Sequence, residues 1–269
     1  LRELTRYKSR LVARGFQQTK GKDYDEVFAP VGKGTTLRVL LAIAALLGWK
    51  IRQMDIVTAF LNGIILEEVY MKQPEGLDDG SGRVCRLKKA IYGLKQAPRA
   101  WYHKLEEALL AGGFKKSECD PSLFLLQEKD EILMLLVYVD DILLFSASTA
   151  LLDSAEQMLE MQFKCSKMGE AKYYLGMHVE RDVEKGVLRL HQRKYCEGLA
   201  EKYGLQDGGK PATPLPSGFT VEPCADEEVV GDSDRKLFHS MVGSLNYAAN
   251  HTRPDIAFAT SRLARWFTP

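Results

Sequence analysis

Two adjacent aspartates interrupt an apolar run, and their position predicts metal chemistry. Asp140 and Asp141 stand between residues 132–139 and 142–145, which are almost entirely hydrophobic. Apolar runs of this length are typical of buried strands, so we expect the two aspartates at the tight turn of a hairpin. Two carboxylates this close repel each other, and a divalent cation relieves that repulsion. On this segment alone, an ordinary aspartate-containing turn is the alternative.

A third aspartate, Asp55, extends this pattern. Residues 51–56 alternate between apolar and polar, as a half-buried strand does, and the chain then turns toward Asn62 and Gly63. Asp55 is therefore expected at a strand end. If that strand lies beside the aspartate hairpin, the carboxylates converge and can hold two Mg²⁺ ions about 3.5–4 Å apart, as in nucleotidyl transfer. Taken alone, Asp55 is equally well interpreted as a surface strand residue.

Residues 83–104 form a purely basic segment, with seven Lys or Arg and no Asp or Glu. Pro98 suits the first turn of a helix, in which Arg99 and Lys104 face solvent. Apolar residues recur at helical spacing and are expected to bury the other face: Trp101, Leu105 and Leu109. A basic loop that bears aromatic residues and leads into a helix suits phosphates and bases. A solvated basic helix without a ligand is the alternative.

Ten short motifs follow one another along the chain: YKSRLVARGF (7–16), FAPV (28–31), QMD (53–55), TAFLNG (58–63), VYM (69–71), YGLKQAPR (92–99), YVDD (138–141), YLG (174–176), MVGSLNY (241–247) and TRPDIA (252–257). In this order they resemble the copia-type (Pseudoviridae) reverse transcriptase of LTR retrotransposons. The resemblance is colinear and covers essentially the whole chain. Each motif alone is weak, whereas the ordered set is specific.

The resemblance implies an α+β, right-hand polymerase fold with fingers, a palm built on an antiparallel sheet, and a thumb. Asp55, Asp140 and Asp141 would then be the catalytic and metal-binding palm carboxylates, holding two Mg²⁺ ions, with Mn²⁺ as an alternative. Phe60, five residues beyond Asp55, takes the place of an aromatic side chain that excludes a 2′-hydroxyl group. For Phe60 considered alone, a core aromatic is the alternative.

The same resemblance implies contacts to nucleotide and nucleic acid. Lys8, Arg10 and Arg14 fall at even spacing, so on a strand they face one side, as fingers residues that grip an incoming triphosphate would. Further nucleotide contacts are implied for Tyr92 and Gly93. Nucleic-acid contacts are implied for Lys95, Gln96, Arg99 and Tyr138, and for the primer-holding hairpin at Leu175 and Gly176.

Three segments are expected along the chain. Residues 1–205 correspond to fingers, palm and thumb, residues 206–234 to a proline-containing linker, and residues 235–269 to the start of a connection region that leads to an absent ribonuclease H domain. The expected strands are 7–15, 51–56, 173–180 and 187–190. The expected helices run from Thr35 or Thr36 to Gly48, from Pro98 to Gly112, and over 151–163, 194–203, 236–249 and 255–266.

Composition sets limits on the class of protein. The chain has 269 residues and 45% hydrophobic content, enough for a sizeable core. The net charge of +1 hides segregation, because residues 1–22 carry seven basic side chains and one acidic one, whereas residues 222–234 are acidic. Near-neutral charge therefore does not argue against nucleic-acid binding.

Cysteine usage and hydropathy bear on location. The five cysteines show neither zinc spacing nor a disulfide pattern, which fits a reducing compartment. The longest apolar runs fall short of the roughly 18 residues that span a bilayer, so no membrane partner is expected. By resemblance, we expect an intracellular protein of a cytoplasmic virus-like particle that also enters the nucleus.

The leading hypothesis is an RNA-directed DNA polymerase that adds deoxynucleotides to a primer on an RNA or DNA template, with a downstream ribonuclease H domain of a parent polyprotein as partner. One alternative is a catalytically decayed remnant that only binds nucleic acid, although the intact carboxylates count against decay. Another is a metal-dependent nuclease, which lacks a candidate general-base histidine near Asp55 or Asp140.

Overall fold

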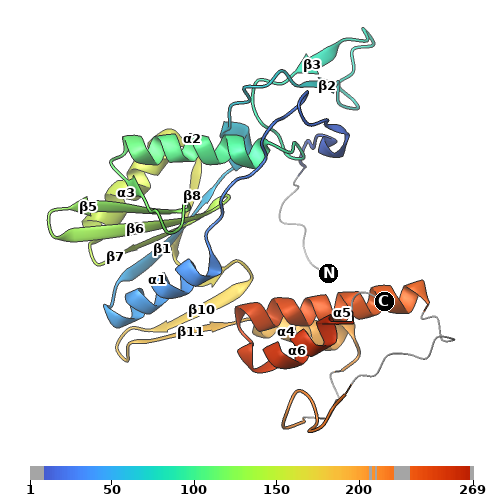
Figure 1. Ribbon diagram of the computed structural model, residues 1–269. Coiled ribbons are helices and arrows are strands. Elements are labelled where there is room, and N and C mark those ends of the chain that lie inside the picture. Colours follow the sequence, from blue (N-terminus) through green and yellow to red (C-terminus); the bar gives the residue numbers. More distant parts are fainter. Residues whose placement is uncertain (1–8, 206–207, 210, 221–230, 267–269) are drawn as a thin grey trace, which may run out of the picture. The chain divides into compact units, whose positions relative to one another are not determined.

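The computed structural model describes residues 9–205, 208–209, 211–220 and 231–266. The chain divides into two compact units, Leu1–Ala171 and Lys172–Pro269 (Figure 1). No helix in the described part of the chain is long and apolar enough to cross a membrane. Helices and antiparallel strands are mixed along the chain, so the predicted α+β class is confirmed.

The first unit is built on a six-stranded antiparallel sheet with the order β4-β5-β6-β7-β1-β8. Its strands are β1 (Lys50–Ile56), β4 (Lys115–Lys116), β5 (Leu123–Glu128), β6 (Glu131–Tyr138), β7 (Asp141–Ser146) and β8 (Cys165–Glu170). The predicted strand over 51–56 and the predicted aspartate hairpin are confirmed. The interior position of β7 agrees with its apolar run, since strands covered on both faces carry such runs.

Three helices cover the sheet: α1 (Gly34–Leu46), α2 (Ala97–Ala111) and α3 (Thr149–Gln162). Figure 1 shows α2 and α3 on one side of the sheet and α1 on the other. Trp101, Leu105 and Leu109 of α2 are buried as predicted. They form the main core with Leu152 and Leu159 of α3 and with one face of strands β1, β6 and β7.

The start of α1 corrects a predicted cap. Neither Thr35 nor Thr36 caps the helix, which begins at Gly34 after Lys33. The Thr36 hydroxyl instead donates a hydrogen bond of 2.6 Å to the Asp120 carboxylate, which also accepts the Lys33 backbone N–H at 3.0 Å. The threonine therefore ties the helix to a loop 84 residues further along the chain.

A smaller subdomain of the first unit carries the two-stranded sheet β2 (Tyr70–Lys72) and β3 (Val84–Arg86), together with the 3₁₀ turns η1 (Gly15–Gln17) and η2 (Ala59–Asn62). Its small core joins Ala13 to Val69, Ile91 and Leu94. The predicted strand over 7–15 is wrong for the described residues 9–15, where one isolated bridge pairs Val12 with Tyr92. The partner of this segment is a loop rather than a strand, so no ladder forms.

The second unit combines the three-stranded sheet β9 (Tyr173–Tyr174), β10 (Met177–Asp182) and β11 (Val187–His191) with helices α4 (Arg193–Lys202), α5 (Asp232–His251) and α6 (Ala257–Ala264), the last preceded by η3 (Pro254–Ile256). The single strand predicted over 173–180 is wrong. Leu175 and Gly176 adopt positive φ of 46° and 81° and turn the chain back on itself, which makes β9 and β10 a hairpin.

The remaining helix predictions agree with the structure within a few residues, although Asp255–Trp266 is divided between η3 and α6. Within the predicted linker, residues 208–209 and 211–220 contain no helix or strand, and α5 already begins at Asp232. The rest of that linker, residues 206–207, 210 and 221–230, lies outside the described residues. The assignment of the segments to fingers, palm, thumb and connection stays a prediction.

Candidate active site

Asp55 and Asp141 lie side by side on neighbouring strands. The antiparallel register of β1 and β7 pairs them directly, and residues paired in this way have Cβ atoms about 4.5–5.5 Å apart. Asp140 stands in the two-residue turn before β7, and its backbone carbonyl accepts a hydrogen bond of 2.9 Å from the N–H of Ile56. The structure thus brings Asp55 together with Asp140 and Asp141, which follow it by 85 and 86 residues in sequence.

Strand alternation places Asp55 and Asp141 on the same face of the sheet. Their neighbours Ile56 and Ile142 belong to the core under α2 and α3, so the two carboxylates point to the opposite face. Tyr138 of β6 pairs with Asp141 in the same row. Asp55, Asp141 and Tyr138 therefore form a polar row on this face, at one end of the strands.

The electrostatics of this end of the sheet oppose full ionisation. Burial raises the pKa of Asp141, and the negative charges of Asp140 and Asp55 raise it further, although a hydrogen bond from Gln53 acts in the other direction. The Gln53 Nε2 donates to Asp141 Oδ1 at 3.1 Å. A cation at this place would relieve the repulsion.

Two supporting side chains were not singled out from the sequence. Gln53 lies two residues before Asp55, so the two-residue period of a strand identifies it as facing the same side. Trp101 was predicted only as a core residue, but its Nε1 donates a hydrogen bond of 2.7 Å to the carbonyl of Val139 in the aspartate turn. No local sequence signal indicates that second contact, because 38 residues separate the two.

Three of the predicted nucleotide-binding residues lie in contact. The rings of Phe60 and Tyr92 meet edge to face with centroids 4.9 Å apart, and the Arg10 guanidinium carbon lies 5.6 Å from the Tyr92 centroid. Gly93 follows with φ of 92°. Arg14 is exposed just before η1, and Lys8 lies outside the described residues. Arg10 and Arg14 do not lie on a strand. Their even spacing therefore does not place their side chains on one side, as the sequence had predicted.

Lys95, Gln96 and Arg99 bind a segment of the protein itself. Lys95 Nζ donates to the Gln18 carbonyl at 3.2 Å and lies 4.9 Å from the centre of the Tyr24 ring. Arg99 forms an ion pair of 2.5 Å with Glu26, which leaves its side chain partly exposed. These two basic side chains therefore help to fold residues 18–26 against the start of α2.

Gln96 requires a correction. Only 2% of this residue is exposed. Its Oε1 accepts from Gln18 Nε2 at 3.0 Å, and its Nε2 donates to the Asp23 carbonyl at 2.9 Å. A buried amide with both ends bonded by the protein is not available to a template, so the predicted nucleic-acid contact of Gln96 does not fit this structure.

Leu175 and Gly176 form the β9–β10 turn of the second unit. The Tyr247 hydroxyl donates a hydrogen bond of 3.2 Å to the Leu175 carbonyl. A Cβ added at Gly176 would lie 2.8 Å from the same hydroxyl oxygen. The tight turn is therefore held against α5 within its own unit, and its predicted contact with a primer stays a prediction.

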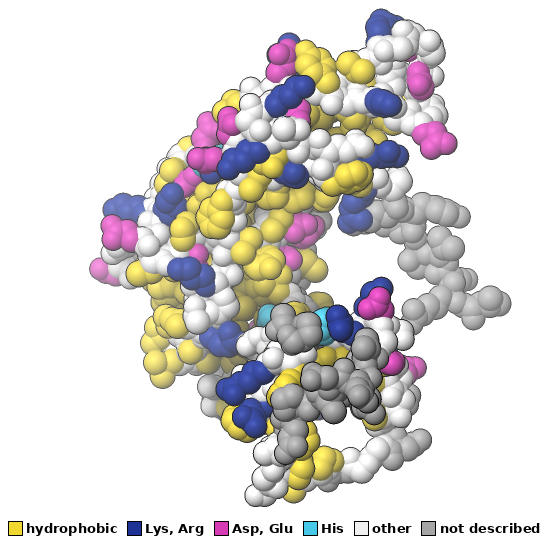
Figure 2. Space-filling model, turned by 45° about the vertical axis from the view of Figure 1, so that its right-hand side comes forward, with side chains coloured by type: hydrophobic (Ala, Val, Ile, Leu, Met, Phe, Trp, Pro, Cys, Tyr) yellow, Lys and Arg dark blue, Asp and Glu magenta, His cyan; other side chains and the backbone are white. Residues whose placement is uncertain are grey.

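Surface charge is mixed. Figure 2 shows Lys and Arg side chains interspersed with Asp and Glu over the face in view. On this face, binding of a polyanion would depend on local groups rather than on one continuous basic surface.

Comparison with known proteins identifies relatives along the chain. Residues 2–217 match the family model described as reverse transcriptase (RNA-dependent DNA polymerase). The chain is 42% identical over 98% of its length to the retrovirus-related Pol polyprotein from transposon RE2 of Arabidopsis thaliana, and 38% identical over 98% to that from transposon TNT 1-94 of Nicotiana tabacum. It covers 18% and 20% of these two polyproteins. It is also 30% identical, over 79% of its length, to the putative transposon Ty5-1 protein of Saccharomyces cerevisiae, of which it covers 68%.

Proposed function

The chain belongs to the reverse transcriptase (RNA-dependent DNA polymerase) family of copia-type retrotransposons, and we propose that it extends a primer with deoxynucleotides on an RNA or DNA template. The observation that carries this proposal is the pairing of Asp55 with Asp141 beside the turn residue Asp140. Three carboxylates on a rigid sheet supply the negative charge that two-metal nucleotidyl transfer requires.

Divalent metal ions fit this donor set. Among the described residues, no three His, Cys, Asp or Glu side chains are already arranged as a metal site. Mg²⁺ is commonly held by one or two carboxylates together with waters and substrate phosphates, so two ions can share the paired Asp55 and Asp141 and the adjacent Asp140 as protein ligands. The raised pKa of Asp141, caused by burial and by its acidic neighbours, supports the same conclusion. When bound, two such ions activate the primer 3′-hydroxyl and stabilise the leaving pyrophosphate.

The chain's own residues position these carboxylates and the nucleotide. Gln53 orients the Asp141 carboxylate by its hydrogen bond. Phe60 follows Asp55 by one short turn, and its ring is fixed edge to face against Tyr92. We assign Phe60 as the residue that excludes a 2′-hydroxyl, because it follows Asp55 by five residues and its ring is held in one position by Tyr92. Arg10, over the Tyr92 ring, is assigned to the triphosphate.

The relatives also suggest partners. The proteins named Pol polyproteins are much longer than this chain, which covers 18–20% of the two plant examples. We infer that the chain works within such a polyprotein, with a ribonuclease H domain as its neighbour, and that the first unit contains palm and fingers and the second unit thumb and connection.

Primer extension tests the proposal. The full chain is incubated with a DNA primer on an RNA template, deoxynucleotides and Mg²⁺, and wild type is compared with Asp140→Asn. Asp130→Asn is the matched control, because Asp130 stands in the turn before β6, within the same antiparallel sheet. We expect extension by wild type and the control, and a loss of at least about 10³-fold in Asp140→Asn with primer–template binding retained. Equal rates in all three would refute the metal role, and tight binding without extension by wild type would indicate a decayed remnant.

A further inference from the structure

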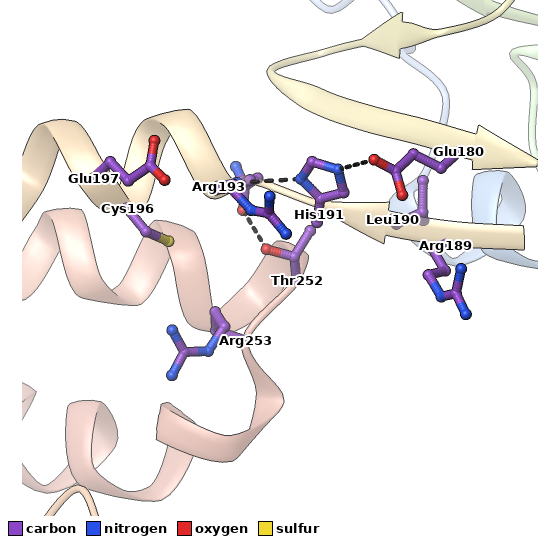
Figure 3. Close-up of a pocket in the computed structure, with 10 residues that line it drawn as sticks. Glu180, Arg189, Leu190, His191, Arg193, Cys196, Glu197, Thr252 and Arg253 are labelled. Carbon is purple, nitrogen blue, oxygen red and sulfur yellow. Dashed lines mark hydrogen bonds and ion pairs between the residues drawn. The ribbon is translucent and has the colours of Figure 1, made fainter. Parts of the chain in front are cut away.

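A cavity of about 530 Å³ opens in the second unit where β11 ends and α4 begins. We call it the β11–α4 pocket. Figure 3 shows its lining residues, with Thr252 and Arg253 contributed by the chain just after α5. Its volume lies in the range of sites for small ligands. Basic residues in the lining outnumber acidic ones by one: Arg189, Arg193 and Arg253 against Glu180 and Glu197.

Gln192 supplies a buried donor to this pocket. Only 2% of the residue is exposed, and its Oε1 accepts a hydrogen bond of 2.9 Å from the Thr252 hydroxyl. Its Nε2 has no hydrogen-bond partner among the described residues. A buried amide donor without an acceptor costs about 1–3 kcal/mol. An oxygen-bearing ligand in the pocket would satisfy it.

The pocket also lies at the N-terminus of the ten-residue helix α4. Gln192 is the N-cap residue, but its side chain makes no capping hydrogen bond. The first-turn N–H groups of a helix carry partial positive charge and favour anions. The pocket therefore combines three kinds of hydrogen-bond donor: the N–H groups at the start of α4, the Gln192 amide and the arginine side chains.

Some of the charged side chains that line the pocket already have partners within the protein. His191 lies between two groups, since its Nδ1 accepts the Arg193 backbone N–H at 3.3 Å and its Nε2 lies 2.9 Å from Glu180 Oε1. Arg253 binds Asp255 through two nitrogens, at 2.8 and 2.7 Å. By contrast, Arg189 and Arg193 form no ion pair within the described part of the chain. Besides the hydrogen bond with His191, both arginines lie close enough to Glu180 to lower its pKa, and Arg189 is its cross-strand partner. Neither is held in an ion pair in that part of the chain, so an anion can contact both guanidinium groups.

We propose that the β11–α4 pocket binds a phosphodiester group of a nucleic-acid strand. Arg193, the Gln192 amide and the N-terminus of α4 contact the phosphate oxygens, with Arg189 beside them. A phosphodiester carries one negative charge, so Glu180 and Glu197 repel it less than they would repel a triphosphate. The choice of a nucleic-acid strand as the source of the phosphate rests on the proposed function.

The test measures binding and its salt dependence with the full chain. A labelled DNA primer on an RNA template is titrated in the absence of deoxynucleotides, over a series of KCl concentrations. Arg193→Gln is compared with Lys194→Gln, because Lys194 is the next residue, is exposed and does not line the pocket. We expect Arg193→Gln to raise Kd about five- to tenfold and to reduce the slope of log K against log salt by about 0.7–0.9, the value for one phosphate contact. Lys194→Gln should leave both nearly unchanged.

A second variant separates the neutral donor from the charge. Gln192→Met keeps the length of the side chain and removes the amide, so it should weaken binding without changing the salt slope. Circular dichroism checks that the variant is folded. Inorganic phosphate, added at constant ionic strength, distinguishes a free anion from the strand backbone.

Each outcome has a defined meaning. Equal Kd values and slopes for Arg193→Gln and Lys194→Gln overturn the inference. Phosphate that stabilises wild type but not Arg193→Gln, with equal nucleic-acid binding by both, also overturns it in favour of a free-anion site. If the slopes differ but wild type does not extend a primer, the proposed polymerase activity fails and this inference stands. If wild type extends a primer and the slopes agree, only this inference fails.

Discussion

The indole Nε1 of Trp101 donates a hydrogen bond of 2.7 Å to the backbone carbonyl of Val139. Trp101 is almost fully buried in α2, with 1% exposed. Val139 precedes Asp140 in the turn and has a φ of 58°, a conformation that a β-branched residue rarely adopts. The hydrogen bond from α2 therefore helps to keep the aspartate turn in this strained conformation.

Trp101→Phe tests this positioning role. The substitution keeps an aromatic ring in the core but leaves the Val139 carbonyl without its donor, so we expect a loss of about 1–3 kcal/mol in stability and a fall in kcat. Tyr102→Phe is the matched control, because the Tyr102 hydroxyl donates a bond of 2.7 Å to the Pro121 carbonyl, away from the aspartates. Equal effects of both variants on kcat, at matched stability, would assign Trp101 a structural role only.

Asp141→Asn should stabilise the metal-free chain at neutral pH. Burial and the charges of Asp140 and Asp55 raise the pKa of Asp141 in the folded state. A raised carboxyl pKa means that the wild-type group favours folding below its unfolded pKa, near about 4, and loses that contribution as pH rises through the folded pKa. Asparagine carries no charge and still accepts from Gln53.

Thermal unfolding at several pH values measures this effect. The melting temperature of Asp141→Asn should exceed that of wild type near pH 7, and the difference should vanish toward pH 4. Added Mg²⁺ should raise the wild-type value more than that of the variant, because the ion neutralises a repulsion that asparagine lacks. A variant less stable than wild type at pH 7 would contradict the electrostatic account.

Phe60→Val tests the sugar selectivity. A smaller side chain removes the ring that packs on Tyr92 and opens space there, so under the proposed assignment ribonucleotide incorporation relative to deoxynucleotide incorporation should rise at least about tenfold. Phe114→Val is the control, since Phe114 is buried in the same core cluster. It should lower stability without changing the ratio. A ratio unchanged in Phe60→Val would remove this assignment.

The sequence predicted the parts of the site that depend on local pattern. Strand alternation correctly placed Asp55 at a strand end, and the apolar runs correctly placed Asp140 in a hairpin turn. Asp141, predicted in the same turn, is instead the first residue of β7 and is paired with Tyr138. The sequence wrongly predicted a strand over residues 9–14, because the alternation of basic and other residues there is typical of a strand. Whether a strand forms depends on its pairing partner, which the sequence does not reveal. The partner is the loop at Tyr92 and Gly93, which offers one bridge and one close hydrogen bond of 2.7 Å from Ala13 N–H to the Tyr92 carbonyl.

The position of Gln96 shows a second limit of prediction from sequence. Its neighbours in sequence are basic, and the motif around it predicted a nucleic-acid contact. Its amide is instead bonded to Gln18 and Asp23, more than 70 residues away in sequence. Contacts at such a separation depend on the tertiary fold, and no period in the sequence reports them.

Gly93→Ala tests the close approach between the loop at Gly93 and the N-terminal segment. Gly93 has a φ of 92°, and a Cβ there would lie 2.1 Å from the Ala13 carbonyl oxygen. Both strain and overlap oppose the substitution, so we expect at least about 1–2 kcal/mol of destabilisation and a higher KM for deoxynucleotides, since Arg10 and Tyr92 lose their relative position. Gly21→Ala is the control, because Gly21 has a φ of 80° but nothing within 4 Å of an added Cβ. Chemical denaturation and steady-state kinetics measure the two effects. If both variants lose the same stability and keep the same KM, backbone strain alone is responsible, and the close approach has no part in nucleotide binding.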